Sequence, residues 1–391
     1  MDLPALRRRL LELVGTEAPA SLDELNPAEW QRLDQLAALH RLQPLLHAQH
    51  SNNDLIPKPI RHGWQQAHRT SALQAMSHRA ALIDCCALLE QAGHTPIALK
   101  GAWLGAQAYP ETAQRPMRDL DLLVPLIGVR EAYELLLTAG YREAEPPEMA
   151  LDDVIRLDKH MPGLVSPRGT MIELHHHLWE PDGRLDHASP ATDEPALRGR
   201  ALLGRDGIRY LAPQDSLAHL IVHAVYSHRL DCGPLLLPDI EYLLRAAPID
   251  WPRFWDQART GHWRGGARLV LDLVARYRPA APIDFAADQG APSPPELLEA
   301  APDLLLQELE TRQSAGLVAA ALKAGPGKLL QRLRGRRSAA GEAAVTRQMQ
   351  SEGGALGWAS SRAWRSITEL ARPDVRRQSR QLAALSRWLD Q

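Results

Sequence analysis

The sequence predicts an α+β protein in which a few short strands near the middle of the chain are flanked by helical regions. Three observations predict it: helical spacing of apolar residues before position 93, three β-like runs between 94 and 180, and a return to helical spacing after 196. The expected divisions are an N-terminal helical region (1–93), a core containing the strands (94–195), a helical region completing the cleft (196–279), and a C-terminal helical, basic segment (280–391).

Bulk composition excludes several classes of protein. Hydrophobic residues make up 45% of the 391 positions and the formal net charge is −2, so neither global disorder nor polyanion binding by the whole molecule is expected. The three cysteines, Cys85, Cys86 and Cys232, form no paired framework and are interpreted as reduced thiols. The sequence has no apolar run of the ~18 residues that a membrane span needs and no signal-peptide core. We therefore expect a soluble, cytoplasmic protein without a membrane partner.

The first ninety residues read as helices. Asn26 precedes Pro27 and Glu29, which is typical of a helix start, and leucines from Trp30 to His47 follow at helical spacing. A second long helix is expected from Ile60 to Gln91, ending at a glycine. Six histidines are placed on helix surfaces because none has metal-ligand spacing: His40, His47, His50, His62, His68 and His78.

The stretch from Arg118 to Val124 is the acidic centre of the predicted core. Side chains alternate along a strand, so Asp119 and Asp121 share one face while the intervening leucines point into a core. Two adjacent carboxylates repel each other, and a divalent cation such as Mg²⁺ or Mn²⁺ would remove the repulsion. The alternative is an exposed strand edge with solvated aspartates.

A strand from Thr95 to Leu99 ends at Lys100 and Gly101, and a helix is expected from Ala102 to Tyr109. A glycine turn between a strand and a helix can present backbone N–H groups to phosphate. Gly101 would admit the phosphate and Lys100 would supply a charge. The alternative is an ordinary strand-to-helix turn.

A third strand is expected at the start of the run from Thr170 to Trp179. Its alternation puts Glu173 and His175 on one face. A third carboxylate could take the proton from an attacking hydroxyl or complete a second metal site. The three consecutive histidines from His175 to His177 cannot all bind one metal while the strand stays regular.

These motifs together carry a family resemblance. The chain is similar to an uncharacterised bacterial nucleotidyltransferase family of the DNA polymerase β-like superfamily, of the type found near lasso peptide clusters. The resemblance covers roughly residues 30 to 260 and includes two further features, His160 to Pro162 and the run from His223 through Asp239 to Trp251. The motifs that carry it are Leu99-Lys100-Gly101, Arg115 and Arg118 with Asp119-Leu120-Asp121, and Ile172-Glu173-Leu174-His175.

The resemblance implies a small mixed sheet with flanking helices, and transfer of a nucleoside monophosphate from an NTP, with ATP as the expected donor. The acceptor would be a hydroxyl or phosphate of a small molecule or peptide, as in lasso peptide biosynthesis. Asp119, Asp121 and Glu173 would be the catalytic residues and the ligands of Mg²⁺ or Mn²⁺. Nucleotide contacts would come from Lys100, Gly101, Arg115, Arg118 and His175. Arg118 could instead form a structural ion pair with Asp119.

The helical half adds histidines of uncertain assignment. His219 and His223 are four residues apart on a helix expected from Ser216 to Tyr226, which is half of a zinc site. They could equally pack between helices or line the cleft, and we favour a place near the cleft for His223 and His228. Asp250 is expected to cap the next helix.

Residues 280–295 are expected to form a linker, followed by a helix from Glu296 to Lys323. The segment 326–391 holds thirteen Lys and Arg against five Asp and Glu. Such a segment could bind nucleic acid, an acidic peptide or a phosphorylated acceptor, or could be a solvated helix face. Few aromatic residues interleave with it, which disfavours nucleic acid. The basic side chains that open it are Arg332, Arg334, Arg336 and Arg337.

Three functions remain open from the sequence. The first is a metal-dependent nucleotidyltransferase. The second is a catalytically degenerate nucleotidyltransferase fold that serves as a binding or regulatory subunit. The third is a histidine-based metal hydrolase, which the strand geometry disfavours.

Overall fold

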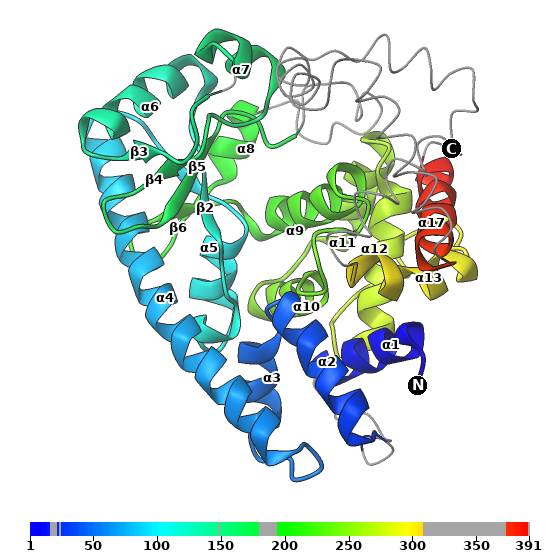
Figure 1. The fold of residues 1–391 in the computed structure, drawn as a ribbon. Coiled ribbons are helices and arrows are strands. Elements are labelled where there is room, and N and C mark those ends of the chain that lie inside the picture. Colours follow the sequence, from blue (N-terminus) through cyan, green and yellow to red (C-terminus); the bar gives the residue numbers. More distant parts are fainter. Residues whose placement is uncertain (16–21, 23–24, 148, 180–193, 308–372, 390–391) are drawn as a thin grey trace, which may run out of the picture.

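The computed structural model describes residues 1–15, 22, 25–147, 149–179, 194–307 and 373–389 (Figure 1). The arginines from Arg332 to Arg337 and most of the basic segment lie outside these residues, as does the expected helix beyond residue 307. In the described part, no helix is both long and apolar enough to cross a membrane.

A seven-stranded mixed sheet forms the centre of an α+β fold, which confirms the predicted fold class. Its strand order is β3-β4-β5-β2-β1-β7-β6, with β2 parallel to β5, β1 parallel to β7, and the other neighbours antiparallel. The strands are β1 Ile97–Ala98, β2 Asp119–Leu123, β3 Arg142–Glu143, β4 Leu164–Val165, β5 Met171–His175, β6 Leu202–Leu203 and β7 Arg209–Tyr210.

Four helices precede the sheet: α1 Leu3–Val14, α2 Pro27–Leu39, α3 Gln43–His50 and α4 Lys58–Gln91. As the sequence predicts, Asn26 caps α2: its side-chain oxygen accepts from the backbone N–H groups of Ala28 and Glu29. The Glu29 carboxylate in turn accepts from the backbone N–H of Asn26. Gly93 follows α4 with a φ of +87°, a conformation that favours glycine. One surface assignment is wrong: His50 is buried, and its Nε2 lies 2.6 Å from the carbonyl oxygen of Leu13.

One face of the sheet packs against α4 and α6 (Val129–Thr138). The alternate residues of β2 and β5 that point to this face are buried, as predicted: Leu120, Leu122, Ile172 and Leu174. Cys85 and Cys86 of α4 belong to the same core. Burying one face of both strands fixes their register, because a slip of one residue would exchange the two faces.

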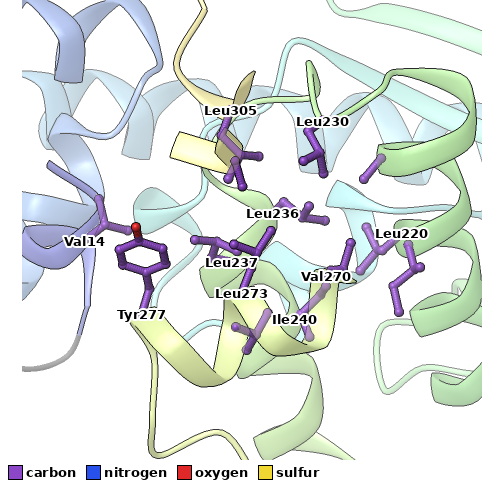
Figure 2. Close-up of a cluster of buried hydrophobic side chains, with 14 of the residues drawn as sticks. Val14, Leu220, Leu230, Leu236, Leu237, Ile240, Val270, Leu273, Tyr277 and Leu305 are labelled. Carbon is purple, nitrogen blue, oxygen red and sulfur yellow. The ribbon is translucent and has the colours of Figure 1, made fainter. Parts of the chain in front are cut away.

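The opposite side of the sheet faces the helical half of the molecule (Figure 1). The helices here include α9 Pro213–Val222, α10 Leu236–Ala246, α11 Trp251–Thr260, α12 Arg264–Tyr277, α13 Pro295–Leu305 and α17 Pro373–Leu389. They share a larger core with the N-terminal helices, part of which is drawn in Figure 2. Residues 280–294, where a linker was expected, contain no helix or strand.

Candidate active site

The sheet brings the two acidic strands side by side. β2 and β5 pair in parallel, with Asp121 opposite Glu173 and Leu123 opposite His175. The polar side chains of both strands therefore share the face turned away from α4 and α6. The three predicted elements, the Lys100 turn, the acidic strand and the third carboxylate, meet in space.

Asp121 is the most enclosed carboxylate of the site, with 6% of the residue exposed. Its Oδ2 lies 3.1 Å from Nζ of Lys100, and its Oδ1 lies 3.0 Å from Nε2 of His175. Burial alone would raise the pKa of Asp121, but the neighbouring Lys100 ammonium and the His175 hydrogen bond hold it well below the usual range. Asp121 is therefore an anion with a cationic partner on each oxygen.

His175 lies between the two carboxylates. Its Nε2 is also 3.6 Å from Oε2 of Glu173. Burial opposes protonation, yet the hydrogen bonds to Asp121 and Glu173 outweigh it and raise the pKa of His175. The hydrogen bond between His175 and Glu173 also lowers the pKa of Glu173. In its protonated form the His175 imidazole offsets the repulsion of the two carboxylates.

Asp121, Glu173 and His175 form the one convergent set of metal-type ligands among the described residues, with ligand atoms within 4.8 Å of one another. The sequence predicted Asp119, Asp121 and Glu173 as the metal ligands, with His175 as a nucleotide contact. Asp119 lies outside the convergent set. The signal that could have placed His175 in the set is its position on the same strand face as Glu173.

Asp119 stands half-buried at the start of β2. Burial and the negative charges of Asp121 and Glu173 raise its pKa. Arg118 is exposed and, within the described part of the chain, makes no ion pair, so the structural pair with Asp119 that the sequence left open is not formed. Asp119 thus lies beside two other carboxylates, with the charges of Lys100 and Arg115 only partly offsetting the repulsion.

The Lys100 turn has unusual backbone geometry. Lys100 adopts a φ of +42° and a ψ of −112°, which non-glycine residues rarely do. Such a conformation costs about 1–3 kcal/mol and persists where the surrounding structure fixes it. The expected helix after the turn begins as α5 (Gly101–Trp103) and continues as a π-helix, η2 (Leu104–Ala108). π-Helical turns occur frequently at functional sites.

Arg115 binds a partner that the sequence did not assign to it. Its Nε and Nη2 lie 3.0 and 2.9 Å from the two carboxylate oxygens of Asp239 in α10. The Tyr109 hydroxyl donates to the same carboxylate at 2.8 Å. The contact between Arg115 and a triphosphate stays a prediction.

Trp179 and three histidines of the helical half form successive ring contacts. Trp179 and His219 have ring centroids 5.3 Å apart, His219 and His223 are 6.0 Å apart, and His223 and His228 are 4.2 Å apart. Burial and the Lys100 charge lower the pKa of His219 and His223 well below the usual value. His223 is the first residue of a π-helix, η5 (His223–Ser227).

Neither of the alternative histidine metal sites is assembled in the described residues. His219 and His223 belong to no convergent group of ligands there. His176 instead places its Nε2 3.1 Å from the carbonyl oxygen of Ile155. His160 packs its ring 5.2 Å from that of His175, and so lies beside the acidic strands.

Comparison with known families now adds to this geometry. A family described as uncharacterised nucleotidyltransferases matches residues 26–279. This chain belongs to that family. The nucleotidyltransferase is therefore an enzyme that transfers a phosphorus-containing group, and its match includes both acidic strands, the Lys100 turn and α10. No curated protein and no solved structure matches the chain.

The donors of the nucleotidyltransferase site fit a divalent cation. Two carboxylates and one imidazole converge on a buried strand face, a set that suits Mg²⁺ or Mn²⁺, with the imidazole favouring the latter. In the structure Lys100 and His175 neutralise the buried carboxylate. A bound cation would take over that role, and His175 would have to be a neutral imidazole to act as its ligand.

Proposed function

We propose that this nucleotidyltransferase moves a nucleoside monophosphate from an NTP, with ATP as the expected donor, to a hydroxyl or phosphate of a small molecule or peptide. The observation that carries the proposal is the convergence of Asp121, Glu173 and His175 beside Lys100. Phosphoryl transfer needs mainly positioning and charge neutralisation, and this arrangement has the groups for both.

In this proposal Asp119, Asp121 and Glu173 would hold the cation, and the position of His175 makes it a further candidate ligand. A bound Mg²⁺ or Mn²⁺ would neutralise charge that develops on the phosphates. Lys100, whose Nζ lies 3.1 Å from Oδ2 of Asp121, would contact the triphosphate. Arg118, exposed at the entry to β2, would add a second charge.

Glu173 is proposed to orient or deprotonate the acceptor hydroxyl. Its side chain is 28% exposed, whereas that of Asp121 is 7% exposed, so it is the more accessible of the two carboxylates to an incoming acceptor. Its pKa is lowered through the His175 hydrogen bond, which keeps it ionised and able to accept a proton.

The domain division supports a site shared between the core and the helical region. Residues 94–195 supply the carboxylates and Lys100, while residues 196–279 supply the buried His219 and Asp239. Residues 1–93 and 280–391 are proposed as the flanking helical segments. The identity of the acceptor, including a peptide in lasso peptide biosynthesis, rests on the resemblance alone. We place the activity in the cytoplasm, where NTPs are available.

The test incubates the full chain with each α-³²P-labelled NTP, Mg²⁺ or Mn²⁺, and panels of hydroxyl- and phosphate-bearing small molecules and peptides. Label should move to an acceptor with release of pyrophosphate, and Asp119→Ala with Asp121→Ala should abolish transfer. Asp84→Asn is the matched control, because it removes an exposed carboxylate paired with Arg168. Transfer that survives the double substitution would overturn the site assignment. NTP binding without transfer to any acceptor would favour a degenerate binding subunit.

A further inference from the structure

Asp239 holds Arg115 in a fixed orientation. The guanidinium and the carboxylate meet in a bidentate pair, with Nε 3.0 Å from Oδ1 and Nη2 2.9 Å from Oδ2. Tyr109 donates its hydroxyl to the same carboxylate at 2.8 Å, and burial raises the Tyr109 pKa, so the hydroxyl remains a donor. Asp239 itself is 3% exposed. Asp239 therefore accepts three hydrogen bonds, two from Arg115 and one from Tyr109, and these fix the orientation of both the carboxylate and the guanidinium.

The remaining nitrogen of the guanidinium lies against the Lys100 turn. A Cβ on residue 101 would collide with Nη1 of Arg115 and would lie 2.9 Å from Sδ of Met117. The φ of Gly101 is not in the left-handed region, so its backbone conformation does not call for glycine. The close approach of Arg115 does, because a side chain at position 101 would occupy the space of the guanidinium. The bidentate pair leaves Nη1 as the donor nearest the turn.

This geometry differs from that of an ion pair that only fastens two elements. An arginine has five N–H donors in a rigid fork, and a carboxylate that binds two of its nitrogens also determines where the third points. Here the third points at the turn where the proposed function places the triphosphate. Lys100 would balance phosphate charge, whereas Arg115, already paired, would contribute a directed hydrogen bond.

We infer that Asp239 is a positioning residue, which orients Arg115 toward the triphosphate of the bound NTP. The inference rests on the proposed function and deepens it. It gives α10, in the helical half, a direct part in assembling the nucleotide site, through a residue 124 positions from Arg115 in sequence. Tyr109 donates to Oδ1 of Asp239, the oxygen that also accepts from Nε of Arg115.

The experiment measures kcat and the KM for ATP in Asp239→Asn, Arg115→Gln and the double variant, with thermal unfolding of each. An asparagine keeps one acceptor oxygen but turns an amide toward Nη2, so the fork loses its bidentate partner. We expect the KM for ATP to rise roughly 10- to 100-fold in each single variant, which corresponds to loss of a hydrogen bond to a charged group. If Asp239 acts through Arg115, the KM for ATP of the double variant should be no higher than that of Arg115→Gln.

Asp215→Asn is the matched control, since Asp215 forms an equally bidentate pair with Arg200 at 3.0 and 2.9 Å. Its KM for ATP should stay at the wild-type value. An unchanged KM in Asp239→Asn, with only a lower melting temperature or folded fraction, would overturn the inference and leave a structural role. Multiplying effects in the double variant would overturn it as well. A wild-type chain that neither binds nor transfers any NTP would overturn the proposed function itself.

Discussion

Replacing Glu173 by glutamine separates catalysis from folding in this site. The substitution keeps the shape of the side chain and removes its charge. Glu173 makes a long contact with His175, at 3.6 Å, and lies opposite Asp121 on the neighbouring strand. Its neighbours Ile172 and Leu174, which hold the strand in the core, are untouched.

The structure sets the expected magnitudes. A partly exposed contact of this length contributes about 1 kcal/mol or less, and losing it is offset by relief of repulsion from Asp119 and Asp121. The melting temperature should therefore change by no more than about 3 °C. A positioned general base contributes about 10²- to 10⁴-fold to the rate. That loss of kcat corresponds to about 3–5 kcal/mol of barrier, so the effect on catalysis should far exceed the effect on stability.

The assay follows label transfer from the α-phosphate of ATP under single-turnover conditions, beside thermal unfolding of the same preparation. Asp84→Asn again serves as the control for loss of an acidic side chain. A Glu173→Gln variant that keeps more than about a tenth of wild-type kcat would refute the assignment of Glu173 as the base. An unfolded variant would refute the claim that the residue is dispensable for the fold.

Three further predictions concern stability and metal binding. Glu241→Gln removes the counter-charge of the buried Arg278 guanidinium and should lower the free energy of unfolding by about 3–5 kcal/mol in urea titrations. The control, Asp256→Asn, breaks an exposed ion pair and should lower it by less than about 1 kcal/mol. Equal losses in the two variants would contradict the reasoning. Burial lowers the pKa of His50, so the unfolded chain binds protons more readily and stability should decline as pH falls below about 6.5. His50→Gln should flatten that decline in melting temperature against pH, and an unchanged slope would count against it. Mn²⁺ at 100 times its Kd should stabilise the wild type by about 2.7 kcal/mol but not Asp121→Asn, and equal stabilisation of both would place the metal elsewhere.

The local features of the core could be predicted from the sequence because they depend on short-range physics. Alternation along a strand is a property of backbone geometry, so the buried position of Leu120 and the shared face of Asp119 and Asp121 follow from five consecutive residues. The Asn26 cap depends on a side chain and two backbone groups within three residues. The predicted mixed sheet came from the family resemblance, since pairing between strands far apart in sequence leaves no local signal.

The charge distribution within the site could not be predicted, because it depends on which side chains meet. The sequence separates Lys100, Asp121 and His175 widely, yet their contacts lower the pKa of Asp121 and raise that of His175. His50 is a simpler example of the same limit. A polar residue without metal-ligand spacing is expected on a surface, and only the packing of α3 against α1 brings His50 to the Leu13 carbonyl.

Arg115 shows how a residue predicted from a motif can depend on a partner that the motif does not contain. The sequence identifies an arginine shortly before the acidic strand, where a phosphate contact is reasonable. It contains nothing to say that a flexible arginine would need a second residue to aim it. Asp239 supplies that restraint from α10, and the absence of a side chain at Gly101 makes room for the guanidinium. In the proposed site the helical half would act on the chemistry by fixing the direction of this donor, which the core strands alone do not orient.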